Sequence, residues 1–466
     1  MDQPTLYCFY DLEVSPPSYD FFTYMQLAEL HRKRYNLSNL FFIFVPGPKD
    51  GFRDDNLSKT TTQRYMMMRN VLVPSCRLLS SHIGTICLPN RNEAEGFYQK
   101  TNGNVFPWLY SPEQPKADYL WNGIVAAYLR NETFTTLQEP PEYQRMVGSL
   151  FPDDGVRKLI TVTVREAPYN TARNTNFQAW LSFLKTLDTS QYKIVIIPDT
   201  NNLSNDVFEG FEYCKIASIN VLFRTAIYRK AYLNMFHNNG PANAAIFSNS
   251  PLLCIQKVET DGVSTTPWFH GVVAIDPDEH HQHAMLKRNQ RLVWGPDTVD
   301  VLVEAFNTYV EDFPEKPILP VEEHGFQSDF HKQLACRSAF GYMTERISKL
   351  KLQLKQEDLD MLKVIVNLMP NFIDPRYMLA IISSKHGKLD TAIQLFDGCI
   401  NLLETKYHVY SDSSKTALYK TLCQSKAEAF EKANRLDEAL NEYIKINERC
   451  PNDNYVLEKI SLLRKN

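Results

Sequence analysis

Short apolar runs alternate with amphipathic stretches over the first 115 residues of the chain. Runs that end in Pro, Gly or Asn are typical of buried strands, whereas apolar residues spaced three and four apart indicate helices. This pattern predicts strands at residues 5–12, 40–47 and 83–90, and helices at 21–35 and 64–71. The resulting β-α-β-α-β order favours a parallel sheet with helical crossovers.

The alternation begins again at residue 158, after a linker with one predicted helix and a polar stretch that contains a proline pair. The run 158–166 is rich in β-branched residues, which favour strands. Further strands are predicted at 193–200 and 251–256, and helices at 221–236 and from residue 174 or 176. Two successive α/β units predict a cleft between them, with ligands at the carboxyl ends of the strands.

Helical periodicity replaces this alternation from about residue 327. The segment 388–396 (KLDTAIQLF) aligns with 435–443 (RLDEALNEY), and Ala380 and Ala427 each lie twelve residues before a second matching alanine. Small residues at this spacing let paired helices cross closely, so the segment resembles tetratricopeptide (TPR) repeats. We therefore expect an α/β protein with two Rossmann-like domains followed by an all-α TPR-like domain. The predicted divisions are 1–115, a crossover at 116–157, 158–315 and 327–466.

Composition narrows the class of protein. The chain has 466 residues, of which 44% are apolar and 22% charged, with a net charge of −4. This balance favours packed cores over disorder and argues against a nucleic-acid partner. The first residues lack the pattern of a signal peptide, and no apolar run approaches the ~20 residues of a membrane span. The nine cysteines include no Cys-x-x-Cys pair, so a reducing cytoplasm is the expected location.

A candidate anion site follows the strand at 158–166. Arg165 ends the strand, and Arg173, Asn174 and Asn176 stand where the next helix begins. Free N–H groups at a helix start favour negative charge, and arginine adds a bidentate fork, so a nucleotide diphosphate is the natural ligand. The alternative is that an asparagine only caps the helix while the arginines are solvated.

A second candidate lies in Asn238, Asn239 and Gly240, which break a predicted helix and precede the small-residue run 242–245. Gly240 removes a side chain where a ligand or a second backbone could approach closely. The alternative is an ordinary helix end followed by a new helix.

These segments resemble the C-terminal half of bacterial GT-B glycosyltransferases, in particular the heptosyltransferase-like and fucosyltransferase-like groups. The resemblance covers about residues 155–310 and implies that the two Rossmann-like domains are in the GT-B arrangement. It implies phosphate contact at Arg165 or Arg173. It implies sugar-nucleotide contact at Asn238, Asn239 and Gly240, and Asn176 joins this predicted site through the anion loop. Arg224 and Tyr228, on the helix that leads to the turn, are either supporting or structural. The sequence departs from those families because it has VTVREAP and Asn-Asn-Gly-Pro-Ala-Asn at their motif positions.

The resemblance also implies chemistry without a metal or other cofactor, the nucleotide sugar being a substrate. A transferase then needs a general base for the acceptor hydroxyl. Asp11 and Glu13, at the end of the first strand, are the candidates, although each could be an ordinary loop acid. The histidines of the segment DPDEHHQH, at 280, 281 and 283, lack a metal-ligand spacing and are expected in a solvated loop.

The leading hypothesis is therefore sugar transfer from a nucleotide sugar to a glycan or glycoconjugate acceptor. The TPR-like end would bind a protein partner or a second copy of the chain. Two alternatives remain open: a non-catalytic scaffold with a degenerate transferase core, and a sugar-nucleotide epimerase, which uses the same two-domain architecture.

Overall fold

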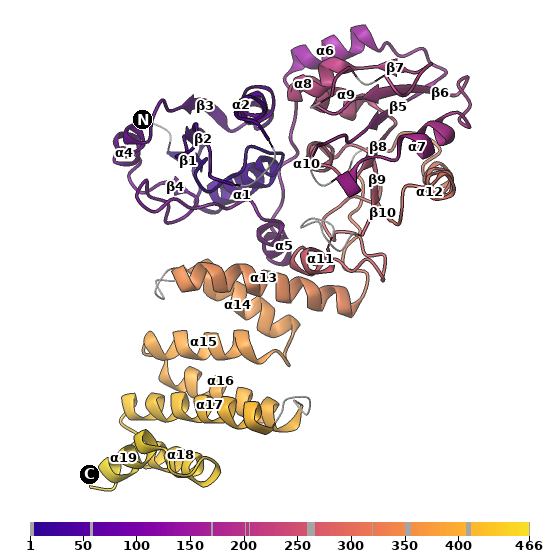
Figure 1. Cartoon of the computed structure of the whole chain (residues 1–466). Coiled ribbons are helices and arrows are strands. Elements are labelled where there is room, and N and C mark those ends of the chain that lie inside the picture. Colours follow the sequence, from indigo (N-terminus) through magenta and orange to yellow (C-terminus); the bar gives the residue numbers. More distant parts are fainter. Residues whose placement is uncertain are drawn as a thin grey trace. The chain divides into compact units, whose positions relative to one another are not determined.

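The computed structural model describes residues 4–55, 59–168, 171–200, 202–204, 206–258, 266–318, 320–349, 356–406 and 412–465. It divides into a first unit, Met1–Ala335, and a helical unit, Cys336–Asn466. The first unit contains two parallel sheets, which define a first half built on β1–β4 and a second half built on β5–β10 (Figure 1). The finer divisions expected at 115, 157, 315 and 327 remain predictions.

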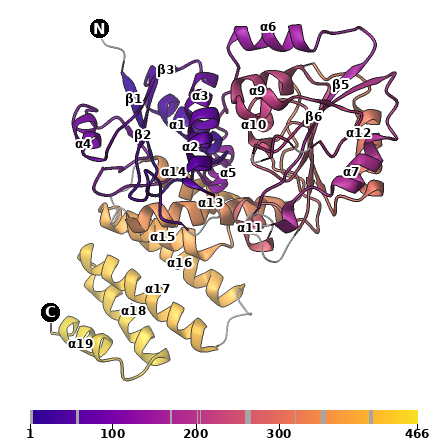
Figure 2. The ribbon, with the colours of Figure 1, turned by 45° about the horizontal axis from the view of Figure 1, so that its top comes forward.

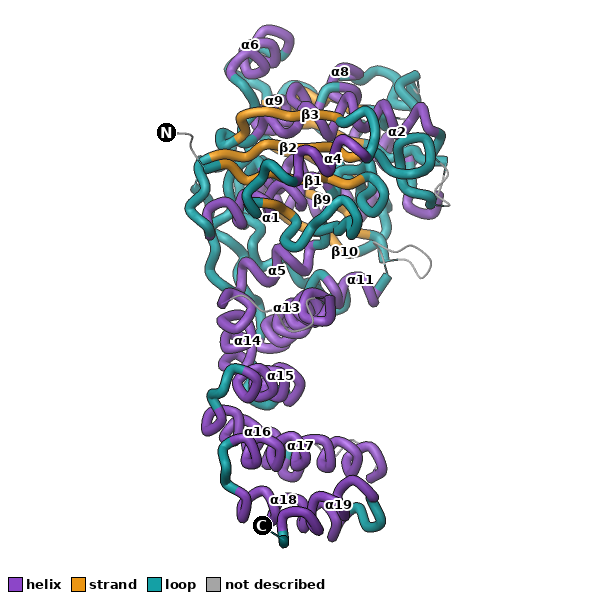
Figure 3. Tube along the Cα trace, turned by 90° about the vertical axis from the view of Figure 1, so that its left-hand side faces the viewer, coloured by secondary structure: helices purple, strands orange, loops and turns teal. Residues whose placement is uncertain are grey.

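The sheet of the first half has the strand order β3-β2-β1-β4, and all its pairs are parallel. Figure 3 shows β3, β2 and β1 side by side. Its strands are β1 Thr5–Asp11, β2 Asn39–Val45, β3 His82–Cys87 and β4 Val105–Phe106. The helical segments of this half and of the linker are α1 Phe21–Arg34, α2 Thr61–Met67, η1 Met68–Leu72, α3 Val73–Ser75, η2 Cys76–Leu78, α4 Asn92–Tyr98, α5 Trp121–Leu129 and α6 Pro141–Leu150.

Strand β1 is apolar between its end residues, Thr5 and Asp11, because both of its faces are covered. Leu6, Cys8 and Tyr10 point into the core shared with α1, while Phe9 packs on Tyr110 on the other face. Alternation of polar and apolar residues is lost when neither face meets water, and parallel sheets are usually buried in this way. The continuous apolar runs of the sequence are therefore explained by the layered fold.

The sheet of the second half has the order β10-β9-β8-β5-β6-β7, again with parallel pairs throughout. Its strands are β5 Lys158–Thr163, β6 Tyr192–Ile197, β7 Glu212–Tyr213, β8 Leu233–His237, β9 Leu252–Gln256 and β10 Gln290–Trp294. Its helical segments are η3 Thr171–Arg173, α7 Phe177–Leu184, α8 Lys215–Ile219, α9 Val221–Lys230, α10 Ala242–Phe247, α11 Pro267–Val272 and α12 Val299–Asp312.

The chain order in this sheet reverses between β5 and β8. From β5 the chain moves outward to β6 and β7, then returns to β8 on the other side of β5 and moves outward again to β9 and β10. Connections that leave two adjacent strands in opposite directions open a crevice at their carboxyl ends. The fold therefore sets a ligand crevice where β5 and β8 end.

One predicted helix is wrong. Residues 221–236 form helix α9 and most of strand β8 instead of one helix. All five residues of β8 are buried, and periodicity cannot distinguish a fully buried strand from a buried helix. Strands β4, β7 and β10 were not predicted; β4 and β7 have only two residues each.

The helical unit continues as successive packed helices, visible in Figure 3. They are α13 Asp329–Lys349, within which the boundary between units falls, α14 Gln356–Leu368, α15 Ile373–Lys385, α16 Leu389–Thr405, α17 Asp412–Lys432, α18 Leu436–Arg449 and α19 Asn454–Leu463. The four repeat alanines are completely buried: Ala380, Ala392, Ala427 and Ala439. The predicted fold class, two Rossmann-like α/β halves followed by TPR-like helices, is confirmed.

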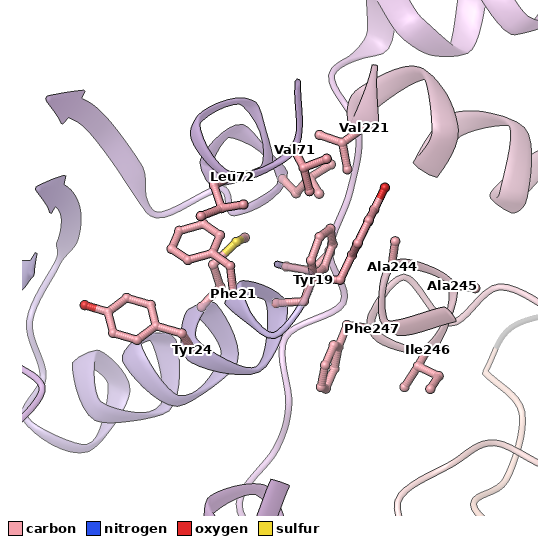
Figure 4. Close-up of a cluster of buried hydrophobic side chains, with 14 of the residues drawn as sticks. Tyr19, Phe21, Tyr24, Val71, Leu72, Val221, Ala244, Ala245, Ile246 and Phe247 are labelled. Atoms are coloured by element: carbon pink, nitrogen blue, oxygen red, sulfur yellow. The ribbon is translucent and has the colours of Figure 1, made fainter. Parts of the chain in front are cut away.

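A shared core joins the two halves of the first unit. Helices α1 and α3 of the first half face α9 and α10 of the second (Figure 2). Figure 4 shows Tyr19 in this core beside the α10 residues Ala244 and Phe247. A Cβ added to Gly240 would lie 2.9 Å from Cβ of Tyr19, a distance that real Cβ atoms do not show. Gly240 therefore lets the two halves close on each other.

We expect Gly240→Ala to lower the free energy of unfolding by about 1–3 kcal/mol, because the new methyl group overpacks the contact with Tyr19. Urea denaturation of the full chain measures this. Gly148→Ala is the matched control: Gly148 lies in helix α6, and no atom lies within 4 Å of the place that its new methyl group would occupy, so stability should stay the same or rise by up to about 1 kcal/mol. Equal effects of the two substitutions would contradict the close contact.

Candidate functional site

A cavity of about 340 Å³ lies at the switch point of the second sheet. We call it the switch-point cavity. Its lining includes residues that follow β5, β6 and β8, residues of β9, and the loop that leads into α1 of the first half. Its polar lining comprises Ser18, Tyr19, Asp20, Lys59, Arg165, Arg173, Asp199, Thr200, Arg224, Asn238, Asn239, Asn243, Gln256, His270 and His283. Crevices at this position of α/β folds are the usual ligand sites.

Two arginines of the loop after β5 form one wall. Arg165 is only 6% exposed, and its main chain is fixed by Thr175, which accepts from the Arg165 N–H at 2.8 Å and donates to its carbonyl at 3.0 Å. The Arg165 guanidinium donates to the side chain of Asn174. Arg173 donates to the carbonyl of Asn238 at 3.2 Å, so the loop is bound to the end of β8. The structure thus brings both predicted arginines into the cavity.

The turn after β8 forms the adjacent wall. Asn239 donates to the carbonyl of Thr163 at 3.3 Å, which joins the ends of β8 and β5. Four buried polar atoms around the cavity have no hydrogen-bond partner among the described residues: the Tyr19 hydroxyl, Asn238 Nδ2, Asn239 Oδ1 and His270 Nδ1. Each such group costs about 1–3 kcal/mol when left unpaired, so this concentration calls for an explanation. A polar ligand in the cavity would provide the partners.

Arg224 supplies a third cation, and it is 1% exposed. Its Nε donates to the Ala217 carbonyl at 2.6 Å and its guanidinium lies 5.9 Å from the ring centre of Tyr19. Tyr228 does not line the cavity. Its hydroxyl accepts from Arg224 at 3.1 Å and lies 2.8 Å from Thr163 Oγ1, so it holds Arg224 in position.

Two residues expected at the site have other contacts. Asn176 caps helix α7, where its side chain accepts from the Ala179 N–H at 3.2 Å, and it does not line the cavity. The capping alternative is therefore the better interpretation of Asn176. Gly240 does line the cavity, but the close neighbour that requires glycine there is Tyr19.

The predicted bases Asp11 and Glu13 are placed away from the cavity. Asp11 is fully buried, and its oxygens accept from both Nη atoms of Arg91, at 2.8 and 3.0 Å, and from the Tyr110 hydroxyl at 3.0 Å. Glu13 lies 3.2 Å from the same guanidinium. Asp11 is thus held by Arg91 and Tyr110, and neither it nor Glu13 lines the cavity, so the role of either residue as base stays a prediction that this geometry does not favour.

Asp20 is one of the two carboxylates that line the cavity, the other being Asp199, and the sequence interpretation missed it. It precedes helix α1, but its side chain makes no capping bond to the helix and accepts instead from the Ser18 hydroxyl at 2.7 Å. Burial raises the pKa of Asp20, against the opposing effect of Ser18 and of nearby cations that include Lys59 and Arg173. The sequence feature that could have pointed to Asp20 is an aspartate between a Pro-Pro-Ser loop and a predicted helix. The same pattern is typical of an ordinary helix N-cap.

The histidine segment is not a solvated loop as expected. His281 is 2% exposed and stacks on His331 with ring centres 4.3 Å apart, and only His280 is exposed. His283 lines the cavity and stacks on Trp121 at 4.5 Å. Burial lowers the pKa of His270, at the same end of the cavity, to about 4. Burial also lowers the pKa of His281 and His283, so these two imidazoles and that of His270 are neutral at neutral pH.

No protein-family model and no curated protein matches the sequence. Solved structures similar to the chain include the ADP-heptose LPS heptosyltransferase II of E. coli, with 11% identity over 66% of this chain and 99% of that chain and a TM-score of 0.41. A glycosyl transferase of family 9 from Veillonella parvula has 10% identity over 73% of this chain and 97% of that chain, with a TM-score of 0.40. A TPR protein from Thermus thermophilus has 14% identity over 36% and 91%, with a TM-score of 0.21.

The expectation of chemistry without a metal is corrected by another of these similarities. The heptosyltransferase TibC, with 12% identity over 67% of this chain and 77% of that chain and a TM-score of 0.30, contains iron. Resemblance to heptosyltransferases therefore does not imply absence of a metal. Within the described ranges, no group of three or more His, Cys, Asp or Glu side chains is arranged to hold a metal ion.

None of the helices in the described part of the chain combines the length and the apolar character that crossing a bilayer requires. The predicted resemblance is confirmed in that heptosyltransferases, a family 9 glycosyl transferase and TPR proteins are among the structural neighbours of this chain.

Proposed function

We propose that the switch-point cavity binds the diphosphate of a nucleotide sugar and that the protein transfers the sugar to a glycan or glycoconjugate acceptor. The observation that carries this proposal is the grouping of Arg165, Arg173 and the unpartnered atoms of Asn238 and Asn239 around one cavity. Guanidinium groups match phosphate oxygens in charge and geometry, and amide groups suit the hydroxyls and phosphates of a sugar nucleotide.

The first half would supply the base. Asp20 enters the cavity from the loop before α1, whereas the arginines belong to the second half. An acceptor hydroxyl between them would give its proton to Asp20 while its oxygen bonds to the anomeric carbon. The bond from that carbon to the diphosphate breaks at the same time, and the diphosphate leaves with the electron pair. Buried cations preorganised around the leaving group stabilise its charge.

A scaffold without catalytic function does not require buried cations and unpartnered polar atoms around a cavity. Arg165 and Arg224 are almost completely buried beside a cavity, and burying cations and unpartnered polar atoms reduces stability. Such costs are expected at a ligand site. The helical unit would then bind a protein partner or a second copy of the chain, as stacked helical repeats do.

Removing one phosphate contact tests the donor site. We expect Arg173→Gln to weaken binding of the cognate nucleotide sugar by about 10- to 150-fold, because a hydrogen bond to a charged group contributes about 1.5–3 kcal/mol. Calorimetric titration with UDP-, GDP-, CMP- and ADP-linked sugars gives the dissociation constants. Lys185→Ala, on an exposed lysine after α7, should leave them unchanged. If none of the four classes binds the wild-type chain, the proposed function is wrong.

Removing the carboxylate tests the chemistry. We expect Asp20→Asn to lower the rate of nucleoside diphosphate release from the bound donor by about 10²–10⁴-fold, with donor affinity nearly unchanged. Glu209→Gln is the matched control, because Glu209 is an exposed acid in the same half as the arginines, and it should leave the rate unchanged. A rate that survives the Asp20 substitution would exclude this residue as the base.

The raised pKa of Asp20 sets the expected pH dependence. A base works only when it is deprotonated, so the wild-type rate should fall as the pH drops through the pKa of Asp20. Because burial raises that pKa, the decline should begin at higher pH than for an ordinary aspartate. A profile of rate against pH measures this decline, which should be absent from any residual activity of Asp20→Asn.

A further inference from the structure

His237, the last residue of β8, lies directly before the Asn238–Asn239 turn of the cavity. It is completely buried, and neither ring nitrogen has a hydrogen-bond partner within the described ranges. Its Nδ1 lies 3.5 Å from Asp297 Oδ2, which is too long for a good hydrogen bond. A buried imidazole with both nitrogens unpaired is costly, so this residue needs an explanation beyond packing.

Asp297 is held in place from another direction. Its Oδ2 accepts from the Asn176 N–H at 2.7 Å and from Trp180 Nε1 at 3.2 Å, and the residue is only 6% exposed. Both donors belong to helix α7 or its cap, so the carboxylate cannot swing away. His237 therefore has a fixed anionic neighbour that it does not fully engage.

The other charged groups that act on His237 are cations. Arg165 and Arg173 come from the loop after β5, and Lys257 follows β9. Burial lowers the pKa of His237 to about 4; Asp297 opposes this shift, and Arg173, Arg165 and Lys257 add to it. In this structure the imidazole is thus neutral at neutral pH, although an acid is beside it.

We propose that His237 is a positioning residue that takes up a proton when a diphosphate occupies the switch-point cavity. This inference rests on the proposed function. The ligand charge would offset that of Arg165 and Arg173, after which attraction to Asp297 favours the imidazolium. The proton comes from solvent, Nδ1–H then donates to Asp297, and the added charge behind the Asn238–Asn239 turn favours the diphosphate. The proton returns to solvent when the product leaves.

Calorimetry of the full chain tests this directly. The probes are UDP-glucose, GDP-mannose and ADP-glucose, whose phosphates are diesters and stay ionised, titrated in two buffers of different ionisation enthalpy between pH 5.5 and 7.5. Proton uptake should increase toward one per bound ligand as the pH falls, and affinity should tighten by up to about tenfold per pH unit. Binding without proton uptake over this range would overturn the inference and leave the proposed function standing. Failure of all three probes to bind would remove both.

Single substitutions test which residue takes up the proton. His237→Gln should abolish the uptake, whereas His386→Gln, on an exposed histidine of the helical unit, should retain it. His270 also lines the cavity, so His270→Gln must retain the uptake if His237 is the acceptor. Uptake that persists in His237→Gln, or that disappears in His270→Gln, would overturn the assignment. If His237→Gln does not fold, loss of proton uptake in His270→Gln would still overturn the assignment.

Discussion

The reversal of strand order between β5 and β8 is the constraint on which the rest of the site depends. A side-chain contact buried in the sheet holds these two strands together: Thr161 Oγ1 donates to Asn234 Oδ1 at 2.6 Å, and Asn234 Nδ2 donates to the Pro251 carbonyl at 2.8 Å. Because the chain leaves the two strands in opposite directions, no crossover helix covers their carboxyl ends. The arginine loop and the asparagine turn therefore meet at one cavity.

The second half alone does not complete this cavity. Tyr19 and Asp20 come from the first half, and Tyr19 fits against Gly240 because glycine has no side chain there. The Asn243 side chain, in α10, donates to the Tyr19 carbonyl at 3.4 Å. The proposed base Asp20 and the arginines come from different halves, which suits a reaction in which donor and acceptor are held by different halves. The packing that joins the halves also places the proposed base.

The site is built at the expense of stability. Arginines with little exposure, unpaired amide atoms and an imidazole without a hydrogen bond are concentrated around the end of β8. The buried Asp11, away from this cavity, is by contrast paired with Arg91. Local violations of packing rules that cluster at one place are typical of functional sites. This contrast distinguishes Asp11, which is structural, from Asp20, which faces the cavity.

The sequence by itself determined most of the alternation of strands and helices in both halves, the repeat alanines of the helical unit, and two of the segments that line the cavity. Buried apolar residues recur along the chain with the period of a helix or a strand. Glycine, asparagine and arginine stand where this periodic pattern is broken. Tertiary structure alone decided that residues 233–237 form a strand, that Asn176 caps a helix, and that Asp20 rather than Asp11 reaches the cavity. These outcomes depend on contacts between residues far apart in the chain, such as Tyr19 with Gly240, and local periodicity contains no information about such contacts.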